Sequence, residues 1–152
     1  MVEVQKVFER LEGSSKLTEN AIAKRLSHLA FPNSRTDKWE TILHLISSSR
    51  SSKGAMIAEM AITMGARPNA RNYNWDTPSH IVAQNNNFEV FRVLRNAGAD
   101  FFAKNKDGKT PIDIANDNGF TDLAMAMQDA MLLKQLKRPY TELIVVGGKK
   151  LK

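Results

Sequence analysis

The apolar residues in the middle of the chain recur at the spacing of two short helices. They are Ile81, Val82 and Ala83 in the first helix, and Phe88, Phe91, Val93 and Leu94 in the second. Thr77 can cap the first helix, and Pro78 suits its first turn because that position needs no backbone N–H donor. Asparagines at 85–87 separate the helices, and Gly98 stands where a left-handed glycine would end the second. The pattern predicts two antiparallel helices behind a polar turn at residues 72–76.

Both ends of the chain show the same helical periodicity. It predicts a helix over residues 2–11 and, after the break Gly13-Ser14-Ser15, a second helix from Thr18 to about Phe31. Near the C-terminus it predicts a longer amphipathic helix that continues to Pro139. The residues expected to face inward are Val4, Val7, Phe8, Leu11, Ile22, Leu26, Leu29, Leu123, Met127, Met131 and Leu136.

Two sequence markers recur at a spacing of 33 residues. Thr77-Pro78-Ser79-His80 returns as Thr110-Pro111-Ile112-Asp113, and Gly65-Ala66-Arg67 returns as Gly98-Ala99-Asp100. A weaker copy, Thr41-Ile42-Leu43-His44, lies 36 residues before Thr77. With these markers the chain resembles the ankyrin-repeat family, whose 33-residue unit opens on Thr-Pro-Leu-His and closes on Gly-Ala-Asp.

The resemblance implies an all-α solenoid of about three helix-turn-helix repeats, at residues 37–71, 72–104 and 105–137. A single helix pair cannot bury its apolar face, so neighbouring repeats must stack and the ends must be covered. We therefore expect residues 1–36 to form an N-terminal helical cap and the long last helix to form a C-terminal cap. Residues 138–152 are expected to form a basic C-terminal tail, in which the β-prone run Leu143-Ile144-Val145-Val146 docks on the last helix in preference to a partner's sheet edge.

Three residues depart from the family pattern. Ser79 stands where the family has leucine, which predicts that the second repeat buries less apolar surface. Trp39 and Trp75 stand where the third repeat has Gly108, at a position that favours a glycine backbone conformation. We expect each indole to cover the neighbouring turn in preference to forming an exposed binding hot spot.

Composition limits the protein's class and its partners. The length of 152 residues, with 42% hydrophobic and 25% charged residues, fits one soluble globular domain. No apolar run is long enough for a membrane span, and the N-terminus lacks the apolar region of a signal peptide. The absence of cysteine excludes disulfides and zinc-thiolate sites and fits the cytoplasm or another reducing compartment. The net charge of +6 has its largest excess in the short tail, which argues against nucleic acid as the partner.

The sequence contains no catalytic constellation, no metal-ligand set and no nucleotide-binding signature, so we expect neither an enzyme nor a cofactor. His44 and His80 fall on the family's histidine position, where the resemblance implies a structural hydrogen bond to the adjoining turn. His28 is expected on a helix surface. The acidic residues of the third repeat are expected to be solvated or to cap helices; they are Asp107, Asp113, Asp117, Asp122 and Asp129.

The resemblance implies a protein–protein interaction module, monomeric on its own, that acts as an adaptor, inhibitor or targeting subunit. Its contact positions lie on the turns and first helices, with Tyr73 as the main anchor. Two alternatives stay open: a pathogen or viral effector acting on a host protein, possibly in the host cytosol, and a nucleic-acid or anionic-surface binder that uses the basic termini. The implied contact residues are Asp37, Lys38, Glu40, Tyr73, Asn74, Asp76, Gln84, Asn85, Lys106, Asp107, Lys109, Asp117 and Asn118.

Overall fold

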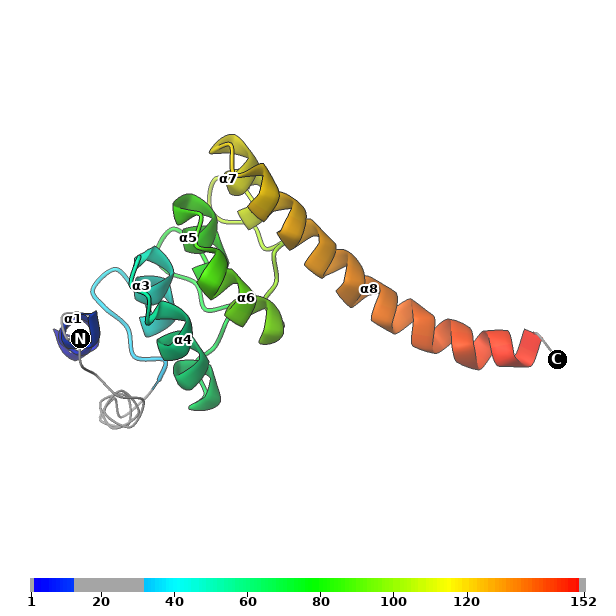
Figure 1. Cartoon of the computed structure of the whole chain (residues 1–152), viewed down its shortest axis with the longest axis horizontal. Coiled ribbons are helices and arrows are strands. Elements are labelled where there is room, and N and C mark those ends of the chain that lie inside the picture. The colour runs from blue at the N-terminus through cyan, green and yellow to red at the C-terminus, as the bar shows by residue number, and fades with distance from the viewer. Residues whose placement is uncertain (1, 13–31, 151–152) are drawn as a thin grey trace.

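The computed structural model describes residues 2–12 and 32–150, and within them the chain forms seven helices and no strand (Figure 1). The predicted second helix of the N-terminal cap, with His28, lies outside the described residues. The helices are α1 (Val2–Glu12), α3 (Ile42–Ser48), α4 (Gly54–Thr63), α5 (Pro78–Asn85), α6 (Phe88–Asn96), α7 (Pro111–Asp117) and α8 (Thr121–Lys150).

Three helical hairpins, α3–α4, α5–α6 and α7–α8, lie side by side, as the repeated spacing predicts (Figure 1). Helices α3, α5 and α7 contact one another in sequence and form one row, which we call the inner row. Helices α4, α6 and α8 form the other row, and α1 packs against α3 at the N-terminal end. The architecture is therefore an all-α solenoid, and the predicted helix at residues 2–11 is confirmed.

Each inner helix begins with a reciprocal cap. Thr41, Thr77 and Thr110 are the N-cap residues, and the residue three positions later returns the hydrogen bond: His44, His80 or Asp113. Pro78 and Pro111 occupy the first helical position, where their missing N–H costs nothing. The predicted start of each hairpin is thereby confirmed.

The two buried histidines also join successive repeats. The Thr41 N–H donates to His44 Nδ1 at 3.0 Å, so the proton of the neutral ring lies on Nε2, which donates to the Asp76 carbonyl oxygen at 2.9 Å. His80 repeats this arrangement, with its Nε2 3.0 Å from the Lys109 carbonyl oxygen. The structural role implied for both histidines is confirmed, and each one fixes a turn of the next repeat.

The core is continuous along the stack. Buried apolar side chains from all three hairpins form one cluster, which Phe8 of α1 joins at the N-terminal end. Phe91 and Phe101 are its largest fully buried members, with ring centroids 5.3 Å apart. Gly98, at φ 79°, follows the end of α6 as predicted and turns the chain toward Phe101.

Ser79 is fully buried on α5, and its hydroxyl group has no hydrogen-bond partner. Because an unpaired buried hydroxyl is costly, Ser79→Ala is expected to raise the free energy of unfolding by about 1 kcal/mol in urea denaturation. Ser47→Ala is the matched control, since Ser47 is equally buried but donates to the Leu43 carbonyl oxygen. That variant is expected to lose about 1 kcal/mol, and a loss of stability in both variants would refute the argument.

Helix α8 does not end at Pro139, as the sequence analysis predicts, but continues to Lys150. The predicted separate tail with a β-prone run at residues 143–146 is therefore wrong in its backbone structure, because that run is helical. Proline removes a single helical N–H donor, and the leucine, lysine and glutamate residues around it favour helix. Figure 1 shows α8 reaching far beyond the hairpins.

Candidate functional site

A tight turn precedes each inner helix, at residues 36–40, 72–76 and 105–109; we call these the first, second and third turn. In the second turn, the Asn72 N–H donates to the Asp76 carbonyl oxygen at 3.0 Å. The Asn72 Oδ1 accepts the Asp76 N–H, also at 3.0 Å. The same backbone hydrogen bond closes the other two turns, so all three project from the stack in one shape.

The residue that holds each turn closed was not identified from the sequence. Thr36, Asn72 and Asn105 stand at the same repeat position, and each side-chain oxygen accepts two backbone N–H groups of its own turn. Short polar side chains commonly make such turns. Their recurrence at the repeat spacing is the signal that could have revealed them.

The turns are also joined to one another. The Tyr73 N–H donates to the Lys38 carbonyl oxygen at 3.3 Å, and the Lys106 N–H donates to the Asn74 carbonyl oxygen at 3.0 Å. These backbone bonds fix each turn against the next. The three turns therefore form a continuous, preformed surface, which loses little conformational entropy when it binds.

Two arginines reinforce the same row. Arg35 donates to the Trp39 carbonyl oxygen at 2.8 Å and to the Arg71 carbonyl oxygen at 2.6 Å. Arg71 then donates to the Lys104 carbonyl oxygen at 3.3 Å. Each arginine thus reaches from one repeat to the next along the base of the turns.

Three aromatic side chains stand half exposed on the first two turns, and we call them the aromatic row. Trp39, Tyr73 and Trp75 are 49%, 56% and 53% exposed. The rings of Trp39 and Tyr73 have centroids 5.8 Å apart. The guanidinium of Arg35 lies 5.1 Å from the centroid of Trp39, and that of Arg71 lies 5.5 Å from that of Trp75. Trp39 does contact the next turn, but a large part of each ring still faces solvent.

The two tryptophans adopt a backbone conformation that favours glycine. Trp39 and Trp75 both have φ 60°, and Gly108 at the equivalent position of the third turn has φ 72°. A left-handed conformation costs a residue with a Cβ roughly 1–2 kcal/mol. The first two turns therefore keep an exposed indole at a position where glycine would be the more stable residue.

Two clefts lie between successive turns. The cleft between the first and second turn has a volume of about 450 Å³, and the cleft between the second and third about 630 Å³. They share Asn74, Asp76 and Gln84, so they are adjacent. The predicted contact residues that line one or both clefts are Lys38, Glu40, Tyr73, Asn74, Asp76, Gln84, Lys106, Asp107 and Lys109.

Asp76 is not free to bind a partner. It is 6% exposed, and its Oδ1 accepts a hydrogen bond from Asn105 Nδ2 at 2.9 Å. Its carbonyl oxygen accepts from His44. The prediction treats Asp76 as a variable surface position, but its carboxylate points into the junction of two turns, where it has a structural role.

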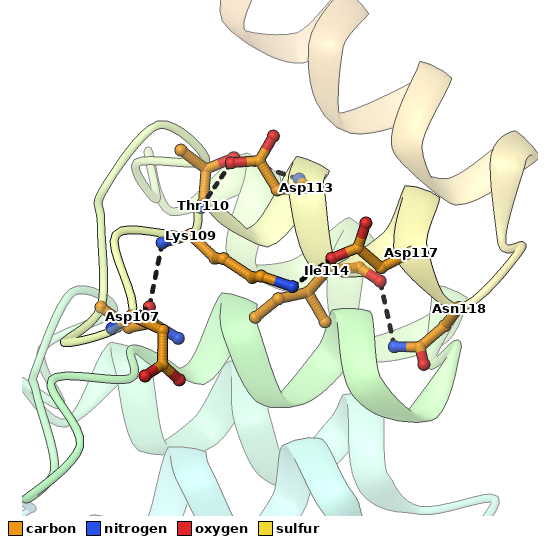
Figure 2. A network of polar contacts seen from close by, with 8 residues as sticks. Asp107, Lys109, Thr110, Asp113, Ile114, Asp117 and Asn118 are labelled. Atoms are coloured by element: carbon orange, nitrogen blue, oxygen red, sulfur yellow. Dashed lines mark hydrogen bonds and ion pairs between the residues drawn. The ribbon is translucent and has the colours of Figure 1, made fainter.

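The four remaining predicted residues do not line these clefts. Asp37 is exposed on the first turn. Asn85 and Asn118 donate from their side-chain amides to the carbonyl oxygens four residues earlier on their own helices, at 2.8 and 3.0 Å. Asp117 forms an ion pair of 2.5 Å with Lys109 (Figure 2). Local hydrogen bonds thus occupy three of these four side chains.

The third repeat is electrostatically self-contained. The hydrogen bond with Asp117 raises the pKa of Lys109 above its usual value. The Thr110 backbone N–H lowers the pKa of Asp113, which caps α7 (Figure 2). Because both members of the Lys109–Asp117 pair are more than half exposed, water screens this pair and its contribution to stability is small.

None of the helices in residues 2–12 and 32–150 combines the length and apolar character needed to cross a lipid bilayer. Over the same ranges, no three histidine, cysteine, aspartate or glutamate side chains come together as a metal site. What the turns offer is a row of exposed aromatic rings beside two polar clefts.

Residues 62–115 match a protein family described as ankyrin repeats in many copies. This range covers the second hairpin, its turn, the third turn and the start of α7. No curated protein matches the chain.

Proposed function

The chain is an ankyrin-repeat protein, and we propose from this premise that it binds another protein through its turns and inner helices. Ankyrin repeats are generally protein–protein interaction modules, and the family is generally non-enzymatic. The proposed surface consists of the aromatic row and the two clefts beside it. Binding to this surface would let the chain act as an adaptor, an inhibitor or a targeting subunit.

The observation that carries the proposal is the pair of strained, half-exposed tryptophans. Ordinary packing does not account for them, because glycine at the equivalent position builds the third turn with the same closing hydrogen bond. Backbone strain concentrates at functional positions. Tryptophan and tyrosine are also enriched among the residues that dominate protein interfaces. The aromatic row therefore supports a contact surface centred on the first two turns.

The charges around the clefts favour a folded protein over a polyanion. Lys38 and Glu40 line the first cleft together, and Lys106 and Asp107 line the second. Lys109 is already paired with Asp117. Such alternation of signs suits a partner with complementary charges of both kinds and gives specificity.

The double variant Trp39→Gly/Trp75→Gly separates binding from folding. Glycine relieves roughly 1–2 kcal/mol of strain at each position, which offsets the lost stacking on Arg35 and Arg71, about 0.5–1 kcal/mol each. We expect an unchanged or slightly raised free energy of unfolding in urea. Affinity for the physiological partner, captured with the wild-type chain and measured by calorimetry, is expected to fall at least about tenfold.

Met64→Ala is the control, because Met64 is an exposed apolar residue at the end of α4 and away from the turns. It is expected to leave partner affinity unchanged. Equal affinity of the wild-type and double-tryptophan chains would place the binding surface elsewhere. Affinity that is lost together with the helical spectrum would show that the tryptophans serve folding instead.

A further inference from the structure

Helix α8 carries a second apolar face that no other part of the described chain covers. Its buried side, with Leu123, Met127 and Met131, packs on α6 and α7. Met125, Leu132 and Leu136 are 62%, 53% and 53% exposed. We call these three residues the α8 stripe.

The α8 stripe has the spacing of a helix–helix contact. Its residues are separated by seven and four positions, which places them within about 20° of one another around the helix axis. Spacings of four and three are those of the seam in paired helices. Leu133, 61% exposed, widens the apolar face on one side.

Charge is distributed unevenly along the same helix. From 121 to 130 the charged residues are Asp122 and Asp129, whereas from 131 to 138 they are Lys134, Lys137 and Arg138. Two α8 helices that lie antiparallel place each acidic half beside the other's basic half. A parallel pair would instead place like charges together. The pattern is thus self-complementary in one orientation only, as a two-fold symmetric interface requires.

The helix is also long enough for such a contact. Its 30 residues extend roughly 45 Å at about 1.5 Å per residue. Among the side chains described on α8, none beyond Met131 is buried. A cleft of about 470 Å³, lined by Arg95, Phe101, Leu133 and Lys134, continues the surface toward α6. Helix and cleft together give a contact area on the scale of a stable interface, roughly 1,000 Å² or more.

We propose that the α8 stripe is the interface of an antiparallel homodimer. This proposal replaces the expectation of a monomer and does not depend on the proposed function of the turns. The dimer carries two turn surfaces, so a partner that presents two copies of its own binding site is held more tightly than by one chain.

Sedimentation equilibrium of the full chain over a roughly hundredfold concentration range tests the dimer by mass action. The wild-type chain is expected to approach twice the monomer mass. Leu132→Glu/Leu136→Glu is expected to weaken association at least about tenfold while the melting temperature stays close to that of the wild type, since both side chains are half exposed. Met64→Glu, the same kind of change on α4, is expected to associate as the wild type does. A monomeric wild type, or a dimer that survives the leucine changes, overturns the proposal.

Charge variants test the antiparallel orientation. Asp129→Lys alone and Lys137→Glu/Arg138→Glu alone are each expected to dimerise more weakly, and their mixture is expected to form heterodimers. Wild-type association is expected to weaken as salt concentration rises, because opposite charges face each other across the interface. Association that strengthens with salt would indicate facing like charges and would overturn the antiparallel arrangement.

Discussion

Replacing Phe101 with alanine is expected to lower the free energy of unfolding by about 3–5 kcal/mol. Phe101 is 1% exposed and packs against Phe91 of the second hairpin, with ring centroids 5.3 Å apart. Its backbone N–H lies 3.4 Å from the sulfur of Met131 on α8. Removing the ring therefore opens a cavity at the junction of the second and third hairpins.

A loss of this size is a large part of the total stability of a small protein, which is about 5–15 kcal/mol. The melting temperature is expected to fall by on the order of 10 °C. Phe102→Ala is the matched control, because the neighbouring Phe102 is 43% exposed. Urea denaturation of Phe102→Ala is expected to show a change of less than about 1 kcal/mol. Equal losses in the two variants would mean that the junction does not depend on the buried ring.

The Phe101–Phe102 pair shows where sequence reasoning ends. Both residues lie outside the helices, in a connecting segment without periodicity, so the pattern gives no reason to bury one and expose the other. In the hairpins the opposite holds, because Thr77, Pro78 and Gly98 each fix a local conformation. The markers at a spacing of 33 residues therefore predict the hairpins and their order but not the packing of the links between them.

The same distinction applies to the candidate site. Turn positions such as Tyr73 and Lys106 follow from the repeat register, and the structure places both beside clefts. The burial of Asp76 could not be predicted, because it depends on Asn105 from the next turn, 29 residues away. The exposure of Trp75 depends likewise on its φ angle, which composition does not reveal.

Lowering the pH from 7 to 5 is expected to reduce the free energy of unfolding through His44. Burial lowers the pKa of His44 from 6.5 to about 4. The unfolded chain binds a proton near pH 6.5, whereas the folded chain does not bind it until about pH 4. Stability is therefore complete above pH 6.5 and is lost progressively as the pH falls toward 4. The loss is about 2 kcal/mol at pH 5 and about 3 kcal/mol at pH 4.

His80 acts in the same direction, because burial also lowers its pKa. Asp113 contributes separately: its pKa is lowered from 3.8, so its contribution is lost only below that range. Measurements between pH 6.5 and 5 thus isolate the histidines. His44→Gln is expected to be less stable at pH 7, because it loses the hydrogen bond to the Asp76 carbonyl oxygen. Its stability is also expected to depend less on pH than that of the wild type. Urea denaturation at several pH values compares the two slopes, and every other titrating group cancels in the difference. Identical slopes would show that His44 takes up its proton equally in the folded and unfolded chains, and the hydrogen bond to the second turn would then survive protonation.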